Sequence, residues 1–186
     1  MKYLIIFLSI IVLAGCGDTQ AGGSSKSTFR DTYWGMTQEE VKEAADTSMN
    51  FRKESDEFIY YNGTLNKEDV DIVFEFDKGK LISAWYSIEN GISDEDKSPI
   101  FVTEGKLENF ESDIIEQLEK KYGKPKELEG EDEDTRKYLQ FEDKDTVIEF
   151  NSHDSYFLKF VRITYSSKEH IDQIKEDKEK GIEEEL

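Results

Sequence analysis

The sequence predicts an α+β fold in which two α-βββ units, each a helix packed on an antiparallel three-stranded meander, follow a signal peptide and a flexible tether. Apolar and polar residues alternate between Val70 and Asp77, which is the period of a half-buried strand. Apolar residues recur every four positions from Phe110 to Tyr122, which is typical of a helix face. The order of one helix and three strands occurs before residue 90 and again after residue 105, as in layered α+β domains.

Residues 1–15 have the features of an export signal. Lys2 is followed by an uncharged, mostly apolar run from Tyr3 to Ala14. As a helix this run would span roughly 18 Å, which is too short for a hydrocarbon core of about 30 Å. The segment is therefore predicted to be a signal peptide rather than a permanent transmembrane helix.

The four residues Leu13-Ala14-Gly15-Cys16 resemble the lipobox of bacterial lipoproteins. The resemblance implies removal of residues 1–15, a diacylglyceryl group on Cys16, and a protein held to the extracytoplasmic face of a cell membrane. Cys16 is also the single cysteine, so no disulfide can form within the chain. Residues 16–28 then form the lipidated cysteine and a polar tether, with an expected reach of about 20 Å.

The first unit is predicted to span residues 29–90. Thr37 and Glu40 have the spacing of a capping box, which predicts a helix from Gln38 to about Asp46. Strands are expected over residues 58–65, 70–77 and 81–88. The turn over residues 77–80 contains Gly79 at a position that favours a left-handed backbone.

A linker is expected over residues 91–105, and the second unit over residues 106–166. Its helix runs from about Leu107 to Tyr122 and is ended by Gly123 and Pro125. Three strands follow over residues 135–141, 146–151 and 156–165, with turns at 143–145 and 152–155. Matching apolar positions lie 74 residues apart in the two halves, such as Phe74 and Ile148, which favours an internal duplication. Residues 167–186 form a charged tail, predicted to be a solvated helix.

The formal net charge is −19, with 43 acidic and 24 basic residues. Loss of residues 1–15 would remove one lysine and no acid, so the mature chain would be slightly more negative. This charge excludes nucleic acid as a partner, because nucleic-acid binding requires a basic face. It also disfavours contact of the domain with anionic lipid headgroups. The strongly negative charge is therefore explained by cationic partners, by binding of divalent cations or by plain solubility.

The stretch Trp34-Gly35-Met36-Thr37 is followed by Val41, a predicted helix and a predicted antiparallel meander. This pattern resembles the start of the folded domain in a known family. It is similar to the small lipoproteins of the outer-membrane β-barrel assembly machinery (the SmpA/OmlA type) and to the β-lactamase-inhibitor-protein fold, in which such units occur in tandem. The resemblance implies a rigid protein-interaction module without catalytic chemistry. The chain departs from the first family in length, and it lacks the four cysteines of the tandem inhibitors.

Residues suited to catalysis are few, and no catalytic residue or cofactor is predicted. Ser152-His153-Asp154 has the residue types of a triad, but neighbours in an extended chain point apart. Glu131, Asp132 and Asp134 form a weak metal candidate in the acidic run 127–134. That run lacks the ligand spacing and the glycine of a Ca²⁺ loop, so a solvated loop is favoured.

Aromatic residues supply the candidate partner-binding site, which consists of Trp34, Tyr61, Trp85 and Tyr86. Aromatic side chains dominate the energetics of interfaces, although the same residues could form the core between helix and sheet. The sequence therefore predicts a membrane-anchored, extracytoplasmic lipoprotein that is not an enzyme and that binds an envelope or secreted protein. The alternative is a surface lipoprotein that binds a cation or a cationic ligand.

Overall fold

A computed structural model describes residues 28–45, 47–89, 91–92, 99–100, 104–128, 136–154 and 159–185. The predictions for the signal peptide, for lipidation of Cys16, for most of the tether and for the acidic candidates Glu131, Asp132 and Asp134 fall outside these residues.

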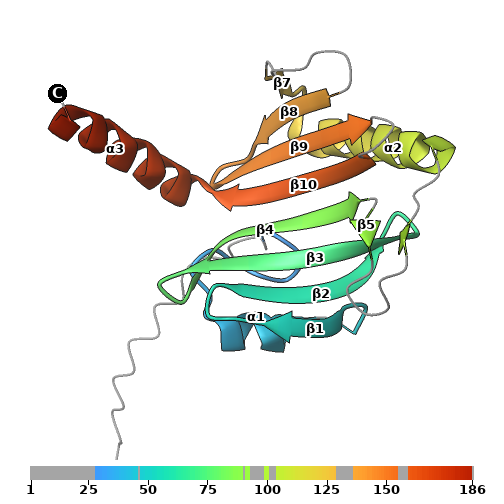
Figure 1. The fold of residues 1–186 in the computed structure, drawn as a ribbon, viewed down its shortest axis with the longest axis horizontal. Helices are drawn as coiled ribbons and strands as arrows, with labels where there is room; N and C mark the ends of the chain where they lie inside the picture. Colours follow the sequence, from blue (N-terminus) through green and yellow to red (C-terminus); the bar gives the residue numbers. More distant parts are fainter. Residues whose placement is uncertain are drawn as a thin grey trace, which may run out of the picture.

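Eight of the described strands form one antiparallel sheet in the order β1-β2-β3-β4-β10-β9-β8-β7 (Figure 1). The strands are β1 (Asn50–Glu54), β2 (Phe58–Leu65), β3 (Glu68–Asp77), β4 (Lys80–Glu89), β7 (Lys126–Glu127), β8 (Arg136–Glu142), β9 (Thr146–Asp154) and β10 (Lys159–Ser167). A separate two-stranded sheet pairs β5 (Gly91–Ile92) with β6 (Pro99–Ile100). The helices are α1 (Gln38–Ala44), α2 (Glu104–Tyr122) and α3 (Lys168–Glu185).

The predicted division into two separate helix-plus-three-strand units is wrong. Strand β4 pairs with β10 along its length, from Ser83 opposite Ser166 to Glu89 opposite Phe160. In separate meanders β4 and β10 would both be edge strands with unpaired backbone groups. Their pairing satisfies those groups and joins both meanders into a single sheet.

Three smaller local features differ from the predicted elements. Strand β1 was not predicted, because Phe51 is the single apolar residue in Asn50–Glu54. The expected turn at residues 152–155 is incorrect for its first three residues, because β9 extends to Asp154 and pairs there with Lys159 of β10. The expected linker over residues 91–105 contains β5, β6 and the start of α2.

Local signals in the sequence are confirmed at the helix ends and at one turn. The Thr37 side chain accepts a hydrogen bond from the Glu40 backbone N–H, and Glu40 accepts one from the Thr37 backbone, which completes the capping box of α1. Gly79 has φ 73° in the turn between β3 and β4, and Gly123 has φ 88° after α2. Both glycines adopt the left-handed backbone that other residues rarely reach.

The core lies between one face of the eight-stranded sheet and helices α1 and α2, which are behind the sheet in Figure 1. We call this side of the sheet the helix face. Val41 of α1 and Phe110 and Ile114 of α2 pack with residues from both halves of the sheet, including Phe74 and Phe150. One core therefore spans both halves of the chain.

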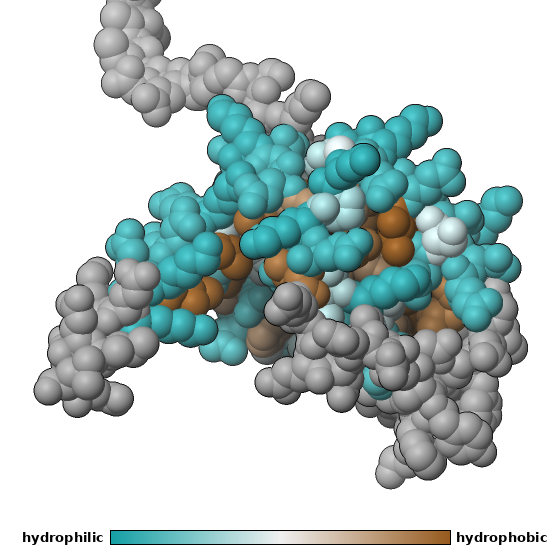
Figure 2. All heavy atoms as spheres, turned by 90° about the horizontal axis from the view of Figure 1, so that it is seen from above, coloured by the Kyte–Doolittle hydropathy of each residue, from teal (hydrophilic) through white to brown (hydrophobic). Residues whose placement is uncertain are grey.

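The opposite side of the sheet carries neither α1 nor α2, and we call it the open face. Helix α3 continues directly from β10 and projects away from the sheet. Seen from the β7–β8 side, hydrophilic residues cover most of the surface, with hydrophobic residues visible between them (Figure 2). Within the described residues, no helix has the length and apolar character needed to cross a membrane.

Candidate interaction surface on the open face

Three aromatic side chains and one valine gather on the open face of strands β2, β3 and β4. Tyr60 is opposite Val73, and Val73 is opposite Trp85, so these three residues form a row across the strands. Phe58 lies two residues from Tyr60 on the same face, and its ring centroid is 6.2 Å from that of Trp85 and 6.0 Å from that of Tyr60. We call Phe58, Tyr60, Val73 and Trp85 the aromatic cluster.

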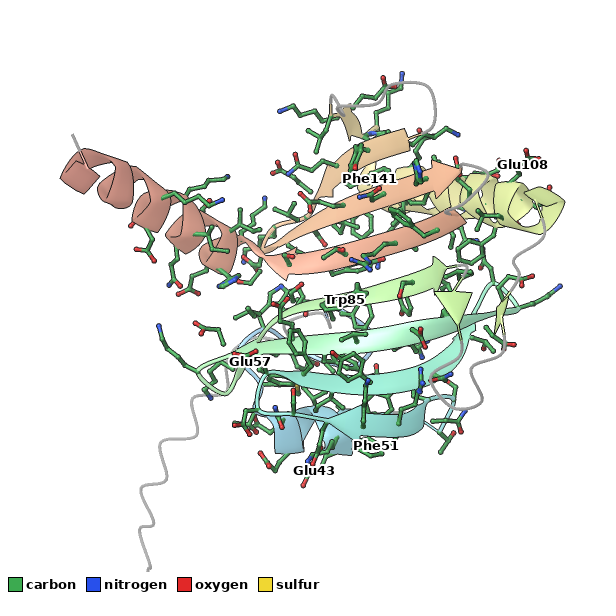
Figure 3. All side chains as sticks on the ribbon, in the orientation of Figure 1. Glu43, Phe51, Glu57, Trp85, Glu108 and Phe141 are labelled. Carbon is green, nitrogen blue, oxygen red and sulfur yellow. The ribbon has the colours of Figure 1, made fainter. Side chains whose placement is uncertain are left out.

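Burial within the aromatic cluster is uneven. Val73 is 4% exposed and forms the floor of the cluster. Phe58, Tyr60 and Trp85 are half-buried, so part of each ring remains in contact with solvent. Trp85 lies near the middle of the sheet, whereas Phe51 lies on the edge strand β1 (Figure 3). The cluster thus extends from β2, next to the edge strand, to Trp85 near the middle of the sheet.

Two cationic side chains lie against the aromatic cluster. The Nζ of Lys53 is 4.8 Å from the ring centroid of Tyr60, and the guanidinium carbon of Arg162 is 5.9 Å from that of Trp85. Both distances are within the range of cation–π interactions. Arg162 is exposed, and no carboxylate within the described ranges pairs with it. Its guanidinium can therefore take part in a further contact while it lies against the indole.

Carboxylates surround this part of the open face. Glu75 is opposite Phe58 and is half-buried, and Glu149 is exposed on β9 opposite Thr164. Burial raises the pKa of the Glu75 carboxyl and Glu57 raises it further, while His170 of α3 and a hydrogen bond from Ser83 oppose the shift. Carboxylates therefore flank the cluster beside the two cations Lys53 and Arg162.

The start of α3 lies at the same end of the open face. Lys168 Nζ is 3.0 Å from Glu142 Oε2 of β8, and the Lys168 backbone N–H donates a 3.1 Å hydrogen bond to the Asp145 carbonyl. The first residue of α3 is therefore joined to the sheet. Beyond it, residues 172–178 are exposed.

The four predicted partner-binding residues do not form one surface. Tyr61 and Tyr86 lie on the helix face and are 4% and 9% exposed, so they belong to the core. Trp34 is partly buried against the core, and its Nε1 donates a 3.0 Å hydrogen bond to Thr146 Oγ1. Trp85 is the member of the set that lies on the open face.

Sequence reasoning did not single out Phe58, Lys53 or Arg162. The available signal was in β2, where Phe58 and Tyr60 alternate with Ile59 and Tyr61, so both faces of this strand are apolar. A strand that is apolar on both faces is either covered twice or exposes an apolar surface. The contributions of Lys53 and Arg162 depend on strand pairing, which the sequence did not reveal.

Exposed Phe51 is a second apolar feature, and it belongs to the edge of the sheet. It is 54% exposed, and its ring centroid is 5.8 Å from that of Tyr61. Charged residues follow it directly, and the register shifts between Phe51 and Lys53. Charges and bulges are devices that protect edge strands from pairing with other chains.

The residues considered for catalysis do not form a triad, and the acidic metal candidates Glu131, Asp132 and Asp134 lie outside the described residues. Ser152 and His153 are 4% and 8% exposed and point to opposite faces of β9, as neighbours on a strand must. Across the described ranges, no group of three or more His, Cys, Asp or Glu side chains could hold a metal ion.

Comparison with known proteins adds no relative: no family model, curated protein or solved structure matches the chain. The resemblance drawn from Trp34–Val41 therefore stays a prediction.

Proposed function

We propose that this chain is a lipid-anchored, extracytoplasmic interaction module without catalytic activity, and that it binds a basic protein through the aromatic cluster of the open face. The observation that carries the proposal is the cluster itself, in which Phe58, Tyr60 and Trp85 are half-buried on a sheet face that carries neither α1 nor α2. The membrane location rests on the lipobox at Cys16.

The aromatic cluster has the composition of an interface centre. The solvated face of an antiparallel sheet is commonly polar, so several large rings there require a reason. Aromatic and arginine side chains supply most of the binding energy at protein interfaces, and Arg162 against Trp85 provides both types together. Each aromatic residue can bury about 150–250 Å² in total, so a modest partner surface would complete the burial of the cluster.

Charge favours a basic partner. The formal net charge is −19, so a second copy of this chain or another acidic protein would be repelled as it approached. Glu57, Glu75 and Glu149 place carboxylates around the cluster, where a basic rim would meet them. Complementary charge of this kind speeds association and excludes wrong partners more than it adds affinity.

The test is site-specific photo-crosslinking in intact cells that express the full-length chain. A photoreactive aromatic residue replaces Tyr60 or Arg162 on the open face, or Glu43 of α1 or Glu108 of α2 on the helix face as matched controls. All of these positions except Tyr60 are exposed, and Tyr60 is half-buried. We expect one basic protein to be captured from the open-face positions and not from the helix-face positions.

Trp85→Ala should reduce this capture at least tenfold, because removal of a hot-spot aromatic typically costs about 2 kcal/mol or more of binding free energy. The thermal unfolding of the variant must remain cooperative for the comparison to count. Equal capture from Glu43 and Glu108, capture that survives Trp85→Ala, or an acidic captured protein would each contradict the proposal.

A further inference from the structure

The chain enters the fold at the middle of the helix face. Phe29 is 2% exposed, and its ring centroid lies 5.4 Å from that of Phe74, 4.7 Å from that of Tyr86 and 5.1 Å from that of Tyr165. These three residues project to the helix face from β3, β4 and β10, which are central strands. The point where the tether joins the fold is therefore opposite the open face.

Arg30 fixes this entry point. Its Nε donates a 3.1 Å hydrogen bond to the Tyr86 hydroxyl, and its Nη1 donates a 3.2 Å hydrogen bond to Ser48 Oγ. Thr32 is 1% exposed and donates a 2.7 Å hydrogen bond to the Phe29 carbonyl. Because these contacts join the entry segment to the core, the segment cannot move to another face without disrupting the core.

The length of chain before Phe29 limits how the domain can sit on a membrane. From Cys16 to Ser27 the tether has twelve residues. Fully extended, such a segment spans about 40 Å at most. Its polar, glycine-rich composition predicts a typical end-to-end distance of about 20 Å.

Turning the open face toward the membrane would require the tether to pass around the domain. The nearer side of the sheet is three strand spacings from β4 or β10, which is about 14 Å because neighbouring strands are about 4.8 Å apart. The path past the ends of the longest strands is slightly longer, at about 17 Å. A further 10 Å or so separates the two sides of a helix-on-sheet layer. Either route would use about 24–27 Å of the tether, which is beyond its typical reach of about 20 Å.

We infer that the anchored protein holds its helix face toward the bilayer and presents the aromatic cluster away from it, to a protein in the extracytoplasmic space rather than to lipid headgroups. This inference rests on the Cys16 anchor and gives the proposed interaction its direction.

The test is energy transfer from the full-length lipidated chain in phosphatidylcholine vesicles that carry a headgroup acceptor dye. The Cys16 thiol is occupied by lipid, so a donor dye can be attached to one introduced cysteine. Glu43→Cys and Glu108→Cys report on the helix face, and Glu149→Cys reports on the open face; all three positions are exposed. We expect the helix-face donors to transfer more efficiently, because they should lie roughly 20 Å closer to the headgroups.

Equal efficiencies, or greater transfer from Glu149→Cys, would overturn the inference. Failure of the chain to attach to vesicles would also overturn it, because the orientation depends on the lipid at Cys16. Inserting a second twelve-residue Gly/Ser segment after Ala21 should bring the three efficiencies closer together. If the order and size of the differences did not change with the longer tether, tether length would not be the cause. No partner protein is present, so the outcome is independent of the crosslinking test above.

Discussion

The indole Nε1 of Trp34 donates a 3.0 Å hydrogen bond to Oγ1 of Thr146, which joins the segment before α1 to the first residue of β9. The same segment pairs with the start of β4, because the Gly35 N–H donates to the Leu81 carbonyl at 2.9 Å and the Leu81 N–H donates to the Met36 carbonyl at 2.8 Å. Residues 34–36 therefore contact both halves of the sheet and reinforce the seam between β4 and β10.

Replacing Trp34 with Phe should lower the free energy of unfolding by roughly 1–2 kcal/mol, because it leaves the Thr146 hydroxyl, 5% exposed, without this donor. Chemical denaturation of the variant measures the change. Thr146→Val removes the other partner, and the double variant completes a cycle. A coupling energy near zero between the two substitutions would contradict a direct contribution of this bond.

The single core predicts that both halves of the chain unfold together. Both tryptophans, Trp34 and Trp85, precede α2, so tryptophan fluorescence reports on the first half of the chain and on its contacts with Thr146 and Arg162. Phe150→Ala in β9 removes a side chain with no exposed surface, which should cost about 3–5 kcal/mol. We expect the fluorescence and far-UV circular dichroism transitions of this variant to shift equally and to remain coincident. A fluorescence transition at its original midpoint would indicate two independent units.

The strand and helix positions were largely readable from the sequence because local patterns determine them. The alternation from Val70 to Phe76 lies on β3, and the capping box of Thr37 and Glu40 opens α1. Such signals depend on neighbouring residues along the chain. The pairing of β4 with β10 depends on residues about 80 positions apart, and apolar patterning alone does not specify which strands become neighbours.

The residues of the candidate surface also could not be identified from local sequence patterns. Trp85 and Tyr86 are adjacent and both aromatic, yet one lies on the open face and the other is in the core. Only the position of α1 and α2 determines which face is covered. Arg162 is brought beside Trp85 by the β4–β10 pairing, so it could not be assigned to the surface before that pairing was known.

A further prediction concerns Gly63 of β2, where a Cβ atom would lie 2.7 Å from Ile72 Cδ1 and 3.3 Å from the Ser48 carbonyl oxygen. Gly63→Ala should therefore destabilise the fold by about 1–3 kcal/mol through overpacking. Ile72→Val removes the Cδ1 atom that is closest. The double variant should lose less stability than the sum of the two single variants, as measured by denaturant unfolding. A strictly additive loss would show that the Ile72 contact is not the cause.

The half-buried carboxyl of Glu75 predicts a specific dependence of stability on pH. Burial raises its pKa above the ordinary value of 4.5, so the folded state holds this proton more tightly than the unfolded state does. The resulting stabilisation is complete below pH 4.5 and is lost as the pH rises through the higher folded-state pKa. At pH 7 the ionised carboxylate is therefore unfavourable in the fold, and Glu75→Gln should raise the melting temperature.

This gain should shrink as the pH is lowered and should disappear below about pH 4.5, where the wild-type carboxyl is itself neutral in both states. Glu149→Gln is the matched control, because it removes one negative charge from the same face at an exposed position. Melting curves of the wild type and both variants between pH 4 and pH 8 make the comparison. Glu75 is half-buried and Glu149 is exposed, so an effect of burial should appear for Glu75→Gln alone. An equal rise in melting temperature for Glu75→Gln and Glu149→Gln at pH 7 would instead assign the effect to the loss of one negative charge.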